Sequence, residues 1–147
     1  MACGLFTTPA GLPTLYVGDV QVSGNNGYVL VSIVAMPAGG LAAVQFGEMG
    51  SEAIALNDID PASVEVEGQN GFVVLAEAFR VSGGAVIAAN GSDGVMSGDI
   101  LRFTFTVTGD NPTFAVTKAS VRLVSSDDEF LATWVLKTAA DAVYIAR

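Results

Sequence analysis

The chain has 147 residues, of which 51% are apolar and only 14% are charged, and it contains 17 glycines. This composition excludes a disordered polar tail and a long helical coil, and the length predicts one compact domain with a sizeable core. The net charge is −9 and the few lysines and arginines are scattered, so the basic face that nucleic acid requires is missing and we expect no nucleic-acid partner.

The N-terminal residues carry no targeting pattern. Met1 to Phe6 lacks the charged and apolar regions of a signal peptide, and no stretch reaches the roughly 18–20 apolar residues of a membrane span. We therefore expect a natural full-length subunit without a signal peptide, or a trimmed precursor, and no membrane insertion. Cys3, the single cysteine, cannot form an internal disulfide; we expect it to be structural or incidental, with intermolecular pairing or a lipid as the alternatives.

Short runs of β-branched and aromatic residues recur about every 8–12 residues, each closed by Gly, Asn, Asp or Pro. This spacing predicts an all-β fold, an antiparallel β-sandwich of about nine or ten strands. We expect an irregular arm over residues 1–13 and a single sandwich domain over residues 14–147. The predicted strands are Thr14–Ser23, Tyr28–Ala35, Leu41–Phe46, Ser63–Glu67, Phe72–Val81, Ala85–Ala89, Ile100–Val107, Phe114–Val124 (one strand or a pair), Phe130–Leu136 and Ala142–Ala146.

Local patterns differ in strength along the chain. Ile100–Val107 alternates most clearly, which predicts that Leu101, Phe103, Phe105 and Val107 face the core. Asn26-Gly27, in Gly24-Asn25-Asn26-Gly27, predicts a tight hairpin, since Asn and Gly tolerate positive φ. Residues 136–145 are also compatible with a helix, but Val143, Tyr144 and Ile145 favour a strand.

The sequence lacks the residues of common catalytic centres. It contains no histidine, which excludes Ser-His-Asp and Cys-His catalysis and histidine-based zinc sites. It also has no phosphate-binding glycine loop that opens a helix. We therefore expect that the chain has no enzymatic activity and binds no cofactor.

Glu77 is the acidic residue most compatible with a shifted pKa. Strand alternation places it on one face with Leu75 and Phe79, where partial burial would raise the pKa of its carboxyl group. A catalytic acid is one interpretation; a carboxylate at a sheet edge, or one paired with a cation on a neighbouring strand, is the other. An enzyme would lose turnover on Glu77→Gln.

Two acidic clusters are weak candidates for Ca²⁺, which takes several oxygen ligands from loops. The first contains Asp58 and Asp60, and the second is Asp127, Asp128 and Glu129. Neither has the spacing of an EF-hand, and such side chains also stabilise turns without any metal. We therefore assign no metal site.

Four aromatic residues, Trp134, Tyr16, Tyr28 and Tyr144, raise the possibility of a sugar-stacking platform. Alternation places Trp134 on one face with Ala132 and Leu136, which is apolar, so we expect it to belong to the core.

Several segments resemble cohesin-type modules, the β-sandwich receptors of cellulose-degrading assemblies that also occur more widely in bacteria and archaea. Gly39 to Phe46 is similar to an early strand of that family, in which a glycine turn leads into small apolar residues and a Gln-Phe step. Asp60 to Val66 is similar to its Asp-Pro turn before a valine-rich strand. The most specific match is Gly91 to Val107, a glycine-rich loop followed by an alternating strand, with the short apolar strand Val86 to Ala89 before it.

The resemblance implies a nine-stranded, jelly-roll-like sandwich that binds another protein and catalyses nothing. The chain has no neighbouring linker and no recognisable dockerin-binding signature, which puts a dockerin partner in doubt. We therefore favour a structural or interaction module on a larger assembly, such as a phage capsid decoration or cement protein or a cell-surface subunit. It would act through a sheet face and the arm Met1 to Pro13, which could add to a neighbour's sheet edge. The partner would be another protein or further copies of the same chain in a homo-oligomer. A cohesin-like receptor for a dockerin-type partner and a carbohydrate-binding module are the alternatives.

Overall fold

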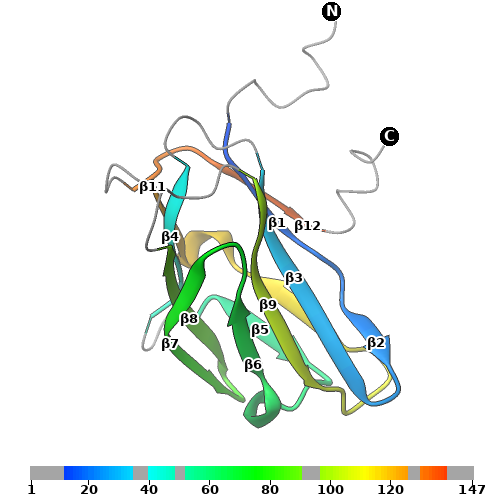
Figure 1. Cartoon of the computed structure of the whole chain (residues 1–147). Helices are drawn as coiled ribbons and strands as arrows, with labels where there is room; N and C mark the ends of the chain where they lie inside the picture. The colour runs from blue at the N-terminus through cyan, green and yellow to red at the C-terminus, as the bar shows by residue number, and fades with distance from the viewer. Residues whose placement is uncertain (1–11, 35–39, 49–51, 91–96, 126–129, 139–147) are drawn as a thin grey trace, which may run out of the picture.

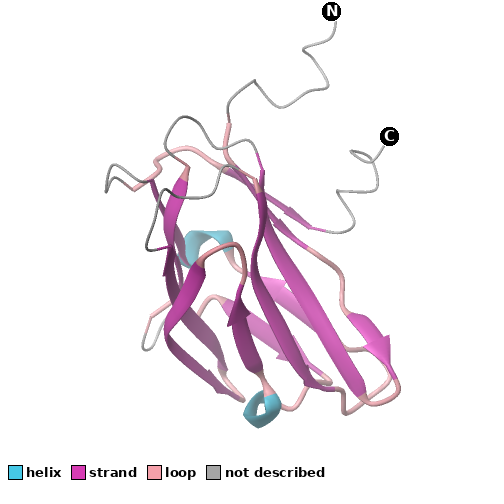
Figure 2. Cartoon of the chain, in the orientation of Figure 1, coloured by secondary structure: helices cyan, strands magenta, loops and turns pink. Residues whose placement is uncertain are grey.

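A computed structural model describes residues 12–34, 40–48, 52–90, 97–125 and 130–138, which form two β-sheets packed face to face (Figure 1, Figure 2). Two short 3-10 turns, η2 (Pro61–Ser63) and η3 (Lys118–Ser120), are the helical elements of the described residues. The strands are β1 (Thr14–Val17), β2 (Gln21–Ser23), β3 (Asn26–Val34), β4 (Leu41–Phe46), β5 (Ile54–Asn57), β6 (Glu65–Gly68), β7 (Phe72–Arg80), β8 (Gly83–Asn90), β9 (Gly98–Thr106), β10 (Thr113–Val116), β11 (Val121–Ser125) and β12 (Val135–Thr138).

The two sheets, named A and B here, each contain six strands. Sheet A has the order β12-β1-β3-β9-β6, with β2 also paired to β3, and sheet B has the order β10-β5-β8-β4-β11, with β7 also paired to β8. β1 and β2 lie end to end along β3, β4 and β5 lie end to end along β8, and β10 and β11 continue beside β5 and β4. The twelve strands therefore occupy nine rows, which confirms the predicted all-β sandwich and accounts for its predicted size.

The core lies between the sheets and is aromatic at its centre. Phe103 on β9 is fully buried, its ring centroid 4.8 Å from that of Phe114 on β10 and 6.1 Å from that of Phe79 on β7. Phe103 belongs to sheet A, and the two others belong to sheet B, so these rings join the two layers. The burial of such large rings is the main source of stability in a sandwich of this kind.

The predicted strand Ile100–Val107 is confirmed as β9, with Leu101 and Phe103 fully buried and Phe105 only 4% exposed. Ile100 is also buried, because a bulge between Leu101 and Asp99 interrupts the register with β3. Leu41–Phe46 is confirmed as β4 with the predicted bounds.

Other strand predictions needed correction. Thr14–Ser23 is split into β1 and β2, because the amide of Val20 turns to the Asp19 side chain (2.9 Å) instead of a neighbouring strand. Phe114–Val124 is the pair β10 and β11, separated by η3. The prediction Phe130–Leu136 is wrong for its first five residues, since β12 begins at Val135. β12 pairs with β1 in parallel, whereas the other strand pairs of the described residues are antiparallel. β5 was not predicted.

The first hairpin turns two positions earlier than the Asn-Gly signal predicts. Ser23 pairs with Asn26, so Gly24 and Asn25 form the two-residue loop and Asn26-Gly27 begins β3. Gly24 has a φ of 62°, which glycine adopts without steric cost. The prediction for Ala142–Ala146, and most of the arm with Cys3, lie outside the described residues; the division into arm and domain remains a prediction.

Candidate docking face

The outer face of sheet B is covered by small apolar side chains. Cross-strand register identifies this face, because residues directly opposite each other in neighbouring strands point to the same side of a sheet. Ile87 on β8 pairs with Ala76 on β7 and with Gln45 on β4, and Gln45 pairs with Arg122 on β11. We define the docking face as the following outward positions found in this way: Ala43, Gln45, Ala55, Val73, Ala76, Ala78, Ala85, Ile87, Ala89, Ala115, Arg122 and Val124. Polar outward residues, Asn57, Arg80 and Thr113, border it at the ends of the strands.

The apolar residues of this face are accessible to solvent. Val73 is 60% exposed and Ile87 is 37% exposed, and the neighbouring Leu75 on β7 is 64% exposed. Leu75 is the extra residue of a bulge between Val74 and Ala76, which directs its side chain away from the ladder. A large exposed apolar surface of this kind typically marks a site of interaction.

A shallow hollow of about 300 Å³ lies on the docking face. Alanine side chains and Ile87 form its floor, because positions 76, 78 and 85 carry no larger group. Glu48 and Glu52, from the segments that follow β4 and precede β5, stand at its rim together with Arg80. The Arg80 Nε atom lies 3.5 Å from the Glu52 carboxylate, so this rim combines both charges. The hollow suits an apolar side chain of a partner, with polar contacts at its edge.

A cation and an aromatic ring lie at the opposite end of the docking face. Arg122 on β11 places its guanidinium group 5.5 Å from the centroid of the Phe130 ring, which is 61% exposed. An exposed aromatic with an arginine beside it is a composition enriched in protein interfaces.

Glu77 lies on the edge strand β7, opposite the buried Val86, and its side chain is exposed. Desolvation raises the pKa of the Glu77 carboxyl group above its ordinary value, and the nearby charge of Glu65 raises it further. The prediction that Glu77 and Phe79 lie on the same face of the strand is confirmed, and Phe79 is partly buried against the core. Leu75 does not share this face, because it is the extra residue of the bulge.

The first acidic cluster stabilises turns. The Asp58 side chain accepts a hydrogen bond from the amide of Asn111 (3.0 Å), and the Asp60 side chain accepts one from the amide of Ala62 (3.1 Å) at the start of η2. Among the described residues, no group of three or more Asp, Glu or Cys side chains is placed to hold a metal ion. Asp127, Asp128 and Glu129 lie outside the described residues.

Of the aromatic candidates, Trp134 is 7% exposed and packs in the core, as predicted, with the Lys118 ammonium group 4.7 Å from its ring centroid. Tyr16 and Tyr28 face outward on sheet A and are partly buried. Tyr144 lies outside the described residues.

Comparison with solved structures identifies the fold. A cohesin module of a family 33 glycoside hydrolase from Clostridium perfringens superimposes with a TM-score of 0.56 at 9% identity, over 89% of this chain and 99% of that module. A non-cellulosomal cohesin from the hyperthermophilic archaeon Archaeoglobus fulgidus gives a TM-score of 0.51 at 15% identity, over 92% and 98% of the two chains. This chain has a cohesin-like fold.

The cohesin-like fold predicted from the sequence is therefore confirmed, although no protein-family model and no curated protein matches the sequence itself. Within the described residues, no helix has the length and apolar character needed to cross a membrane.

Sequence reasoning did not find the docking face. β8 reads Gly-Gly-Ala-Val-Ile-Ala-Ala-Asn, which is apolar at both inward and outward positions, so no alternation separates its two sides. The signal that was available is the run of alanines in β4, β7 and β8, which places small side chains on one sheet.

Proposed function

We propose that this cohesin-like chain is a non-catalytic interaction module that binds a protein partner on the docking face of sheet B. The observation that carries the proposal is the exposed apolar surface around Ile87, which has a hollow beside it and charged residues at both ends. Its setting would be a larger assembly outside the cell, either a cell-surface structure or a virion. A cohesin-like receptor for a dockerin-type partner is the alternative that the resemblance implies.

The test compares two lysine substitutions on opposite faces of the sandwich. Ile87→Lys places a charge in the centre of the docking face, whereas Val34→Lys replaces another exposed β-branched residue on the outer face of sheet A. The two variants carry the same added charge, so a difference between them reports the face and not the charge. Ala78→Trp is a third variant, which fills the hollow without any charge.

Wild-type and variant proteins are immobilised and exposed to extract of the source, and bound proteins are quantified by mass spectrometry before their affinities are measured with purified material. We expect one partner to bind the wild type and Val34→Lys equally and to be lost with Ile87→Lys and Ala78→Trp. Loss of a central contact residue typically weakens binding by about 2 kcal/mol or more, roughly 30-fold. Retention of every bound protein by Ile87→Lys would overturn the proposal.

The same experiment distinguishes the settings. A capsid or tail protein supports a virion subunit, and a dockerin-bearing enzyme supports a cohesin-like receptor. Sedimentation analysis of the purified chain tests for a homo-oligomer. If the wild type forms one through the docking face, the Ile87→Lys variant should be monomeric.

A further inference from the structure

A second concave surface lies on sheet A, away from the docking face. It is a groove of about 550 Å³ over β2, β3, β9 and β6, a volume within the range of sites for small molecules. Its lining includes residues that face each other in one register row, Gln21, Tyr28, Thr104 and Glu65 from four adjacent strands. Four side chains distant in sequence are thus fixed side by side on rigid strands.

The groove is lined by one cation, one carboxylate and several uncharged polar side chains, beside Val22, Gly27 and Phe105. Arg102 and Glu65 are its only charged lining residues among those that the structure describes, and the other polar groups are hydroxyls and amides. The remaining polar side chains are Gln21, Ser23, Asn26, Tyr28, Ser63, Thr104 and Thr106. A lining without net charge favours an uncharged ligand, and a polar lining disfavours a purely apolar one.

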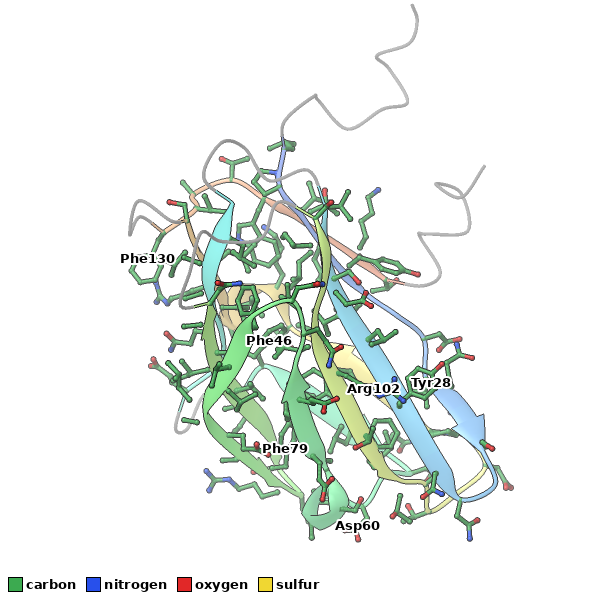
Figure 3. All side chains as sticks on the ribbon, in the orientation of Figure 1. Tyr28, Phe46, Asp60, Phe79, Arg102 and Phe130 are labelled. Atoms are coloured by element: carbon green, nitrogen blue, oxygen red, sulfur yellow. The ribbon has the colours of Figure 1, made fainter. Side chains whose placement is uncertain are left out.

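Arg102 and Tyr28 form an ordered pair in this groove (Figure 3). The guanidinium carbon lies 4.4 Å from the centroid of the Tyr28 ring, a distance at which the cation and the face of the ring attract each other. An arginine already held against a ring loses less conformational freedom when its N–H groups bind a ligand.

The hydrogen-bonding groups match a ligand that both donates and accepts. Arg102 only donates, an ionised Glu65 only accepts, and the hydroxyl and amide side chains do both. Sugar hydroxyl groups have the same double capacity, so neighbouring hydroxyls of one ring could donate to Glu65 and accept from Arg102. A peptide added as a further strand would pair with the edge strand β2 or β6 and would not lie across the floor of the groove, because β3 and β9 are paired on both sides.

We propose that the groove formed by β2, β3, β9 and β6 binds a neutral saccharide, with Tyr28, Arg102 and Glu65 as its principal contacts. This site lies on the sheet opposite the docking face and does not depend on the proposed protein partner. A module with both sites would hold a protein on one side and a glycan on the other.

The test uses the full chain on a microarray of neutral and acidic oligosaccharides, followed by calorimetric titration with the best neutral binder. We expect saturable binding to a neutral oligosaccharide. Tyr28→Ala and Arg102→Ala should each weaken it about tenfold, since loss of an aromatic or charge-assisted contact removes on the order of 1–2 kcal/mol. Arg102→Lys keeps the charge but loses the planar fork, and should also weaken binding.

Two controls make the result specific. Tyr16→Ala removes a tyrosine from the same outer face but outside the groove, and it should leave the affinity unchanged. Ile87→Lys, on the other sheet, should also leave it unchanged even where it abolishes protein binding. Circular dichroism melting confirms that each variant is folded.

The proposal is overturned by any of three results: no neutral oligosaccharide binds, only acidic oligosaccharides bind, or Tyr28→Ala and Arg102→Ala bind as the wild type does. None of these results bears on the docking face, so the two proposals fail separately.

Discussion

The outer faces of the two sheets have the same backbone pattern but opposite chemistry. On sheet A, most outward positions carry polar side chains such as Tyr28, Arg102, Thr104 and Glu65, as is usual for a sheet that faces water, with Leu30 and Val34 among the apolar exceptions. On sheet B, the corresponding positions carry mainly alanine, valine and isoleucine. Polar outward residues therefore suffice to build a sheet of this fold. The apolar character of sheet B is not a requirement of folding, and binding is the more economical explanation for it.

The comparison depends on which side of each strand is buried, and substitutions on β9 test this most directly. Phe103→Ala removes a fully buried ring that contacts two other rings, so the free energy of unfolding should fall by about 3–5 kcal/mol. Thr104→Ala, the next residue on the outer side, should change it by less than about 1 kcal/mol. Urea denaturation measures both, and similar losses would contradict the assignment of faces.

Substitutions at Gly84 and Ala85 test the assignment of the inner and outer faces of sheet B in the same way. A Cβ atom at this position would overlap the ring of Phe79, which lies on the inner side of the sheet. Gly84→Ala should therefore lower the free energy of unfolding by about 1–3 kcal/mol through overpacking. Ala85→Ser, on the docking face, should stay within about 0.5 kcal/mol, and a larger loss there would show that this face is less open than its exposure indicates.

The sequence predicted the two-sheet sandwich better than it predicted which side chains lie on the outer faces of the sheets. The strict alternation of residues 100–107 identified β9 and its core residues, because one side of that strand is polar. β5 was missed because Ile54–Asn57 has only four residues and is recognisable as a strand only from its position beside β8, in line with β4. β12 was placed too early because the aromatic residues before it, Phe130 and Trp134, resemble part of a strand but lie outside one: Phe130 forms an isolated bridge and is exposed, and Trp134 is buried from an irregular segment.

Neither candidate site could be read from local sequence. The groove on sheet A joins residues 21–28, 63–65 and 102–106, which only the register of four strands brings together. Tyr28 was recognised as a possible sugar contact, but its partner Arg102 was seen only as the polar side of an alternating strand. Long-range register is a tertiary property, and no local pattern encodes it.

The loop between β5 and β6 joins sheet B to sheet A, and its acidic residues hold it in place. Asp60→Ala removes the side-chain cap of η2 and should lower the free energy of unfolding by about 0.5–2 kcal/mol. Because Asp58 and Asp60 already accept hydrogen bonds from backbone amides, CaCl₂ or a chelator should leave the melting temperature unchanged. A rise in melting temperature with CaCl₂ would show that the ion binds the folded chain, and would contradict this turn-stabilising role.

Glu77 gives the smallest expected effect and tests the seam between the two sheets, where β7 lies beside β6. Burial, together with the charge of Glu65, raises the pKa of Glu77 above its ordinary value of 4.5, so the folded chain holds this proton more tightly than the unfolded chain. The stabilising contribution is therefore complete below about pH 4.5 and is lost as the pH rises through the folded-state pKa.

Glu77→Gln removes this dependence. Relative to the wild type, the variant should be more stable at pH 7 than at pH 4, by a small margin because the side chain is exposed. Glu65→Gln should act in the same direction by lowering the pKa of Glu77 toward its ordinary value. Urea denaturation of the three proteins at both pH values measures the differences. A wild type that gains stability relative to Glu77→Gln as the pH rises would show that Glu77 is instead held ionised by a cation, and the seam would then be an ion pair.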